Sequence, residues 1–249
     1  LFTKEQLPVD YHSEAFTLES MIKVDKQLRC KRCYSQIEED WQLPEGQYYC
    51  RACIVFGRNQ EGNELYYFPS KTSEIEFPVL KWLGELTPYQ AEVSEKLLET
   101  YQKQKDSLVH AVTGAGKTEM IYKIVAYVLG NKGRVAIASP RVDVCRELFL
   151  RMQRDFTCSI SLLHAESEPY DGSPLVIATT HQLLKFYQNF DLVIVDEVDA
   201  FPFVGNVMLN HAVEQAKKET GRYIYLTATS TISLEEQVRL GTLEKHHLA

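Results

Sequence analysis

The sequence predicts an α/β fold, in which helices cover both faces of a parallel sheet, preceded by a small module built on four cysteines. From Thr87 onward, short apolar runs alternate with segments of helical periodicity, and upstream of them four of the six cysteines fall into two tight pairs. Buried runs that alternate with amphipathic helices are typical of βαβ units and of a parallel sheet. We therefore expect three regions: residues 1–60 with the cysteine module, a connector at 61–84 and the α/β lobe at 85–249.

The composition is that of an ordinary globular chain, with 249 residues, 45% of them hydrophobic, and a formal net charge of -7. An acidic chain does not coat nucleic acid through a general basic surface, so any nucleic-acid function must rest on motifs. No stretch reaches the ~18 uncharged apolar residues that span a bilayer, and the first residues lack the pattern of a signal peptide. We therefore expect a cytoplasmic protein, in which paired cysteines bind metal rather than form disulfides.

Six apolar runs are expected to form the strands of the sheet: Ser107–Ala111, Arg134–Ala138, Ser159–Leu163, Leu175–Ala178, Leu192–Val195 and Tyr223–Leu226. Between the first two, apolar residues from Met120 to Val128 recur at helical spacing, and Gly130 is placed to end that helix. In open parallel sheets, ligands bind beyond the carboxyl ends of the strands. The polar motifs of this sequence follow those ends.

A glycine-rich segment links the first expected strand to the helix after it. Backbone N–H groups of such a loop can turn around a phosphate, and the helix N-terminus adds a positive dipole. Lys117 is placed to reach the β- and γ-phosphates, and the Thr118 hydroxyl suits Mg2+. The strict pattern has glycine at the first position, where this chain has Ala111. The residues expected to bind the triphosphate of ATP are Thr113, Gly114, Ala115, Gly116, Lys117 and Thr118.

A second motif follows the expected strand Leu192–Val195, which ends abruptly in Asp196 and Glu197. These carboxylates should lie at the same edge of the sheet as the glycine-rich loop. There, Asp196 can hold Mg2+ through its water shell, and Glu197 can orient and deprotonate the water that attacks the γ-phosphate. Lys117, Asp196 and Glu197 are the expected catalytic residues, and Asp196 also belongs to the cofactor site.

Together these motifs resemble the first RecA-like lobe of the second helicase superfamily, of the DEAD/DEAH type. The resemblance covers Leu86 to about Ser230 and includes Thr227-Ala228-Thr229 at the end of a later strand. It implies a P-loop NTPase that hydrolyses ATP with Mg2+ while it holds a nucleic-acid strand. In that family, the segment that matches Thr227 and Thr229 couples the nucleotide site to nucleic-acid binding.

Gln90 has two compatible interpretations. Thr87, Pro88 and Gln90 have the spacing of a helix N-cap, a proline at the first helical position and the glutamine of a capping box. In the helicase superfamily the matching glutamine reads the edge of adenine with its amide, which is both a donor and an acceptor.

Two further segments resemble the superfamily motifs that hold the backbone of one nucleic-acid strand. The first contains Pro140 and Arg141 after the second strand, and the other contains Thr179 and Thr180 after a later one. Contacts of this kind do not depend on base sequence. The alternative is that the hydroxyl groups simply cap helices.

The pairs Cys30–Cys33 and Cys50–Cys53 are separated by 16 residues, and four thiolates satisfy tetrahedral zinc. The sequence therefore predicts a zinc site at Cys30, Cys33, Cys50 and Cys53. Its role is open between a staple for a segment too short to build its own core, a surface for a partner, and direct DNA contact.

The cysteine module ahead of the lobe, together with the loop segment 113–122, resembles the ComFA family of bacterial competence ATPases. The loop is equally similar to that of the PriA replication-restart helicases, which begin with a different DNA-binding domain. The ComFA resemblance implies a DNA-dependent ATPase at the inner face of the cytoplasmic membrane that draws single-stranded DNA through the uptake channel during transformation. The partners it implies are single-stranded DNA, the DNA-uptake channel and competence proteins such as a ComFC-like protein, and it allows a homo-oligomer.

The superfamily also implies a second lobe with an arginine finger, beyond this chain. We therefore expect the chain alone to bind ATP with Mg2+ and to hydrolyse it slowly. Two other functions stay open: an ATP-gated zinc adaptor that recruits partners to DNA, and an RNA helicase, since no motif here reads the 2′-hydroxyl.

Overall fold

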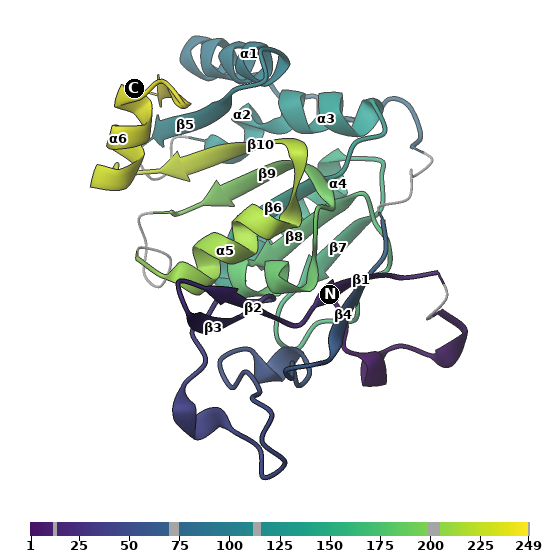
Figure 1. Ribbon diagram of the computed structural model, residues 1–249. Coiled ribbons are helices and arrows are strands. Elements are labelled where there is room, and N and C mark those ends of the chain that lie inside the picture. Colours follow the sequence, from purple (N-terminus) through teal and green to yellow (C-terminus); the bar gives the residue numbers. More distant parts are fainter. Residues whose placement is uncertain (12–13, 70–74, 112–115, 199–204, 249) are drawn as a thin grey trace.

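The computed structural model describes residues 1–11, 14–69, 75–111, 116–198 and 205–248. Within them, seven strands form one parallel sheet in the order β11-β5-β10-β9-β6-β8-β7 (Figure 1). In chain order they are β5 (Asp106–Ala111), β6 (Val135–Ser139), β7 (Ile160–Leu163), β8 (Leu175–Thr179), β9 (Phe190–Asp196), β10 (Lys217–Thr227) and β11 (Leu243–Leu248). The parallel sheet with helices on both faces is thus confirmed.

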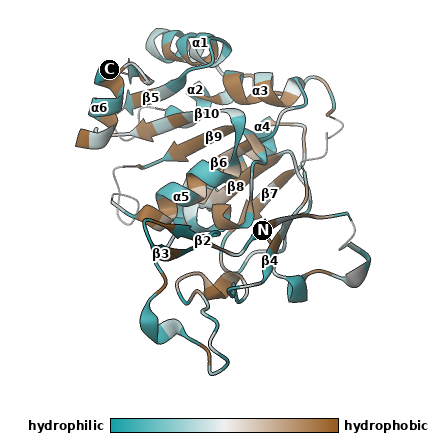
Figure 2. Cartoon of the chain, in the orientation of Figure 1, coloured by the Kyte–Doolittle hydropathy of each residue, from teal (hydrophilic) through white to brown (hydrophobic). Residues whose placement is uncertain are grey.

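Helices cover this sheet on both faces. They are α1 (Pro88–Gln102), α2 (Lys117–Met120), α3 (Tyr122–Gly130), α4 (Val142–Asp155), α5 (Val207–Ala216) and α6 (Ile232–Arg239), with a 3-10 helix η5 (Thr180–Lys185). Successive residues of a strand face opposite sides, so Val135 and Ile137 of β6 pack with α1, α3 and α4, whereas Ala136 and Ala138 pack with α5 and η5. The central strands are mostly brown, that is hydrophobic, whereas α1 carries much teal, as expected for a buried sheet under amphipathic helices (Figure 2).

The six strands expected from the sequence are all present, but β11 and the first half of β10 were not expected. The first half of β10, Lys217–Gly221, is polar, and its pairing with β9 shifts register between Lys217 and Arg222. β11 lies at the edge of the sheet, paired with β5 alone. An edge strand and a polar strand lack the apolar run by which a buried strand is recognised.

The N-terminal part contributes two small antiparallel sheets (Figure 1). β1 (Phe16–Glu19) pairs with β4 (Glu64–Tyr67), and β2 (Met21–Val24) pairs with β3 (Gln27–Cys30). We call residues 20–59 the four-cysteine module. This segment begins one residue before β2 and ends at the last residue bonded to the cysteine cluster.

The four-cysteine module is seated on α5. The Lys31 carbonyl lies 3.1 Å from His211 Nε2, and Gln215 Nε2 donates to the Arg32 carbonyl at 2.9 Å. Tyr34 stacks on the His211 ring with centroids 5.1 Å apart. The buried residues of the module and those of the α5 face of the sheet belong to one continuous hydrophobic cluster.

The segment before α1 runs along the end of α4. Lys81 N–H donates to the Asp155 carbonyl at 2.8 Å, and Thr157 N–H donates to the Val79 carbonyl at 3.0 Å. Trp82 meets Tyr122 edge to face, with ring centroids 5.5 Å apart. These contacts fix the entry into α1 and therefore the position of Thr87 at its start. No helix in the described parts of the chain is both long and apolar enough to cross a membrane.

Candidate nucleotide and metal sites

Four neighbouring strands, β5, β10, β9 and β6, end at one rim of the sheet (Figure 1). Leu226 of β10 is in register with Val109 of β5 on one side and with Asp196 of β9 on the other. Adjacent strands lie about 4.8 Å apart, so the ends of β5 and β9 are roughly 10 Å apart across β10. The end of β5 and the carboxylates at the end of β9 therefore occupy the same rim.

Gly116 opens α2 at this rim in a left-handed conformation, with a φ of 73°. A side chain there would be strained, and its Cβ would collide with Gln90 Nε2. Lys117 and Thr118 form the first turn of α2 and are partly buried. N–H groups in the first turn of a helix lack partners within the helix and favour an anion. The other expected phosphate-binding residues, Thr113, Gly114 and Ala115, lie outside the described residues.

Gln90 makes the expected capping box. Its Oε1 accepts from Thr87 N–H at 2.9 Å, and its own N–H donates to Thr87 Oγ1 at 3.3 Å. The near contact with Gly116 also brings its amide against the end of the phosphate loop. The capping bonds hold the Gln90 side chain beside the expected nucleotide site, so capping and adenine recognition are compatible in this geometry. Adenine recognition by Gln90 stays a prediction.

Asp196 and Glu197 lie where β9 leaves the sheet. Asp196 Oδ1 accepts from Glu197 N–H at 3.0 Å, and Glu197 has a φ of 57°, which is unusual for a residue with a side chain. Among the described atoms, Glu197 Oε2 is buried without a hydrogen-bond partner. A buried carboxylate oxygen without a donor is costly to a fold and is typical of a functional site.

Arg141 lies beside this carboxylate pair. Its Nη1 is 3.8 Å from Glu197 Oε1, and its Nη2 is 2.6 Å from Asp143 Oδ2. The side chain is exposed, and Pro140 before it is partly buried. The residue expected to hold a nucleic-acid phosphate is thus also in contact with the expected catalytic base, which the sequence did not indicate.

Thr179 ends β8 at the same rim, and Thr180 follows it as the first residue of η5. Both are buried, and Thr180 Oγ1 has no partner among the described residues. Any contact between Thr180 and a nucleic-acid strand would therefore have to use the backbone or a rearranged side chain. The strand contact at these two residues stays a prediction.

A short turn closes the end of β10. Thr227 Oγ1 donates to the Thr229 carbonyl at 2.6 Å and accepts from Thr229 N–H at 3.1 Å. Thr227 is fully buried, next to the strand that carries Asp196. This position suits a segment that passes a change at the nucleotide site to the surface of the lobe.

The four cysteines converge as the spacing predicts. Their Sγ atoms all lie within 4.8 Å of one another, and all four side chains are buried. The Cys30–Cys53 and Cys33–Cys50 sulfur separations are 3.7 and 3.5 Å. A disulfide needs about 2.05 Å, whereas sulfurs at about 2.3 Å from one tetrahedral zinc ion lie about 3.8 Å apart. The geometry therefore fits a shared metal ion and not two disulfides.

Two further side chains donate to the sulfurs. Arg32 Nε donates to Cys53 Sγ at 3.3 Å, and Asn59 Nδ2 donates to Cys30 Sγ at 3.1 Å. Hydrogen bonds from the other three thiols, with a smaller one from Asn59, lower the pKa of Cys30. Arg32 is fully buried and also donates to the Phe56 carbonyl at 2.6 Å. The sequence did not indicate this burial, because adjacency to a cysteine does not by itself place an arginine in the interior.

The fold and the rim define the class of P-loop nucleotide-binding α/β lobes. Residues 87–237 match the DEAD/DEAH box helicase family, so the chain belongs to that family. The match covers more than half of the chain and begins at the capping residue Thr87.

Two competence proteins are similar over the whole chain. The chain is 57% identical over 251 residues to competence protein ComFA of Streptococcus pneumoniae, with 100% of this chain and 57% of that protein covered. It is 34% identical over 260 residues to competence protein ComFA of Bacillus subtilis, with 99% and 56% covered. The chain thus spans just over half the length of these relatives.

Replication restart protein PriA of Synechocystis is 29% identical over 124 residues, which cover 45% of this chain and 15% of that protein. This shorter match does not favour the PriA alternative. Among solved structures, the Pyrococcus furiosus Hef helicase domain gives a TM-score of 0.53 at 22% identity, over 68% of this chain and 39% of that one. That likeness supports the fold alone.

Proposed function

We propose that this chain is the ATP-binding lobe of a motor that moves along single-stranded DNA, and that the motor drives DNA uptake across the cytoplasmic membrane during competence. The observation that carries the proposal is the β5-β10-β9 register, in which the start of α2 and the carboxylates of β9 share one rim. The similarity to ComFA proteins supports the role in competence.

In this proposal, the loop 113–118 binds the phosphates of ATP, and Lys117 neutralises charge on the β- and γ-phosphates. The Thr118 hydroxyl and the Asp196 carboxylate are hard oxygen donors of the kind that Mg2+ prefers, so they would hold that ion. Mg2+ would neutralise phosphate charge as it develops. Glu197 accepts a proton from the attacking water, and the Gln90 amide reads adenine.

The same rim would also carry the DNA strand. Pro140, Arg141, Thr179 and Thr180 contact its backbone, and Thr227 with Thr229 couples that contact to the nucleotide. We further propose that the four cysteines hold zinc, because four buried thiol sulfurs at these separations fit its tetrahedral preference.

The region boundaries of the proposal are residues 1–60 for the zinc-bearing segment, 61–84 for the connector and 85–249 for the lobe. The partners would be single-stranded DNA, the uptake channel and a ComFC-like competence protein, and the motor would act as a peripheral protein at the inner membrane face. Self-association is compatible with this role. Support for these assignments comes from the similarity to ComFA proteins.

The decisive measurement is the ATPase rate of a longer form that carries the downstream region of its relatives, with and without single-stranded DNA. We expect strong stimulation by single-stranded DNA and weaker stimulation by RNA of the same length. A rate that does not respond to either strand would contradict the motor function.

A further inference from the structure

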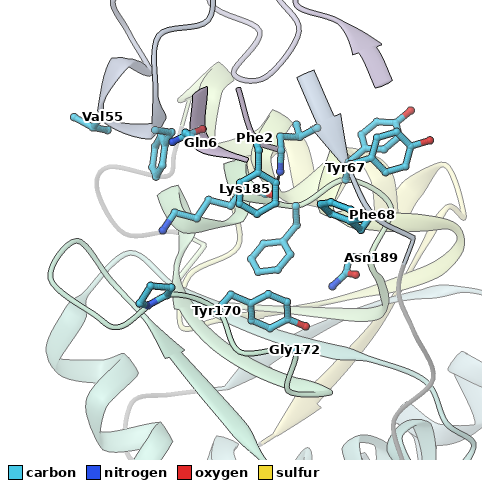
Figure 3. A pocket seen from close by; sticks show the side chains of 14 residues that line it. Phe2, Gln6, Val55, Tyr67, Phe68, Tyr170, Gly172, Lys185 and Asn189 are labelled. Carbon is cyan, nitrogen blue, oxygen red and sulfur yellow. Dashed lines mark hydrogen bonds between the residues drawn. The ribbon is translucent and has the colours of Figure 1, made fainter. Parts of the chain in front are cut away.

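A cavity of about 570 Å³ lies away from the nucleotide rim, between the N-terminal segment, the four-cysteine module and the lobe (Figure 3). On the lobe its walls are Tyr170 and Gly172, which precede β8, and Tyr187 and Asn189, which precede β9. Those residues stand at the amino ends of the strands. The cavity is therefore distinct from the site at the carboxyl ends.

Half of the residues that line the cavity are aromatic. They are Phe2, Phe56, Tyr67, Phe68, Tyr170, Phe186 and Tyr187. Phe186 meets Tyr170 edge to face with centroids 5.1 Å apart, and Tyr67 meets Tyr187 at 4.9 Å. Rings held by other rings lose little freedom when a flat group enters between them, so the wall is suited to stacking.

Asn189 supplies an unused donor in this wall. Its side chain faces the cavity between Phe68 and Tyr170 (Figure 3). The residue is only 8% exposed, and Nδ2 has no partner among the described residues. Its backbone N–H donates to the Ala216 carbonyl at 2.8 Å, which fixes its position. A buried donor without a partner costs stability unless a ligand satisfies it.

Lys185 supplies a positive charge in the same cavity. Its Nζ lies 5.8 Å from the centroid of the Phe56 ring. No Asp or Glu is among the described residues that line the cavity, although the chain as a whole is acidic. The cavity thus combines aromatic faces, a donor and an uncompensated cation.

We propose that this cavity binds a nucleotide, with the base among the aromatic rings, Asn189 Nδ2 donating to a base oxygen or ring nitrogen, and Lys185 on the phosphate. The volume is within the usual range for a small-ligand site, about 300–1,000 Å³. An aliphatic peptide side chain would fill the aromatic walls but leave both the Asn189 donor and the Lys185 charge unsatisfied. A nucleotide satisfies all three features.

A free nucleotide and a base of single-stranded DNA share this chemistry. A second cavity of about 310 Å³ shares Phe68, Tyr170, Gly172 and Asn189 with the first, so a neighbouring nucleotide has space beside it. This continuity favours a strand. Only the choice of a DNA strand as the source of the nucleotide rests on the proposed function. The binding of a nucleotide in the cavity does not depend on ATP hydrolysis.

The test is a photocrosslink between the protein and an oligothymidylate that carries a single 5-iododeoxyuridine, followed by mapping of the attached residue. We expect crosslinks at rings of this cavity, such as Tyr170 or Tyr187, in the unmodified chain without ATP. Competition by thymidine monophosphate would assign the cavity to free nucleotides, and competition by unlabelled oligothymidylate alone would assign it to a DNA strand. Crosslinks confined to the rim near Arg141 would overturn the proposal.

Two variants test the polar groups. Lys185→Gln should weaken the crosslink and the oligothymidylate affinity by roughly tenfold, as expected for a charge-assisted hydrogen bond. Lys103→Gln is the matched control, since Lys103 is an exposed lysine at the end of α1 and its loss changes the net charge equally.

Asn189→Leu separates binding from folding. Replacing an unsatisfied buried amide by an apolar side chain of similar size should keep or raise the melting temperature. The same change should lower the crosslink yield severalfold. An unchanged yield, or preferential capture of an aliphatic peptide over thymidine monophosphate and oligothymidylate, would overturn the proposal. Neither result bears on DNA-stimulated ATP turnover. The cavity proposal and the proposed motor function can therefore be contradicted separately.

Discussion

Glu197 is held in an unusual backbone conformation, with a φ of 57°, directly after the mostly buried strand β9. A left-handed conformation costs a non-glycine residue about 1 kcal/mol or more. Among the described residues its Oε2 is buried without a partner, while its Oε1 lies near Arg141. These features hold the carboxylate at the rim, where the proposed motor needs a base for the attacking water.

Glu197→Gln should remove that base while keeping the shape of the side chain. We expect ATP turnover of the longer, DNA-stimulated form to fall by about 10²–10⁴-fold, the usual contribution of general base catalysis. Binding of a fluorescent ATP analogue should persist. Glu236→Gln, at an exposed position on α6, is the control. DNA uptake that survives the loss of turnover would favour the ATP-gated adaptor over the motor.

Arg141→Ala should weaken the coupling between ATP hydrolysis and single-stranded DNA binding, both of which are proposed to take place at the rim. The side chain faces Glu197 as well as the expected path of the strand, so its loss should weaken single-stranded DNA binding by roughly two- to fivefold, the range of an exposed ion pair. The unstimulated ATPase rate should rise, since Glu197 loses a competing partner. Steady-state rates with and without DNA measure both effects. Arg146→Ala on α4 is the control, and an equal effect there would contradict a specific role.

Residue types and spacing were sufficient to predict that the four cysteines converge and that the carboxylates after β9 share a rim with the start of α2. The roles of these carboxylates and of the lysine loop stay predictions. Residue types and spacing could not predict that Arg141 reaches Glu197, because these two residues are 56 positions apart in the sequence. Asn189 was also missed, since a single asparagine before a strand carries no motif. Contacts that depend on tertiary packing leave no local pattern in one sequence.

At the scale of elements, α5 is the support on which the four-cysteine module rests. Gln215 of α5 is buried and donates to two carbonyls, those of Arg32 at 2.9 Å and Leu184 at 3.5 Å. One amide thus joins the module, the helix and η5.

Gln215→Leu should leave the Arg32 carbonyl buried without a donor. The free energy of unfolding should fall by about 1–3 kcal/mol, the cost of an unsatisfied buried group. Urea denaturation monitored by tryptophan fluorescence measures it. Gln237→Leu at an exposed position of α6 should change stability by less than about 0.5 kcal/mol. Equal effects of the two substitutions would argue against the docking contact.

Removal of one cysteine should cost more than removal of one hydrogen bond. Cys53→Ser takes away a metal ligand and the partner of Arg32, so bound zinc should fall well below one ion per chain. A loss of about 3 kcal/mol would lower the melting temperature by roughly 6–12 °C. Elemental analysis and thermal unfolding measure the two effects. Cys158→Ser, outside the cluster, should retain the metal, and zinc retained by Cys53→Ser would refute four-cysteine coordination.

The buried strands were predictable because each is an apolar run of nearly the right length. The hairpin β2–β3 and the strand pair β1–β4 were not, because each of these strands has only four residues and mixes buried with exposed positions or is mostly exposed. Their positions depend on contacts with the cysteine cluster and with the lobe, which join distant parts of the chain.

At the scale of the whole molecule, the proposed motor divides its ATP site between this chain and a downstream lobe. We expect it to bind ATP with Mg2+ but to turn over roughly 10³-fold or more slowly than a form with the downstream lobe, because an arginine finger contributes about that factor. Calorimetry measures the first property and phosphate release the second. Lys117→Ala should abolish binding. Equal rates with and without the downstream lobe would contradict a divided site.

The shared hydrophobic cluster has a consequence for any attempt to shorten the protein. The sequence suggests residue 85 as a boundary for truncation. A chain that starts there would expose α5 and the aromatic surface around Phe186 to solvent. Apolar surface that becomes exposed to solvent in this way promotes self-association. The isolated lobe should therefore aggregate, and the practical boundary of the folding unit lies upstream of the first cysteine.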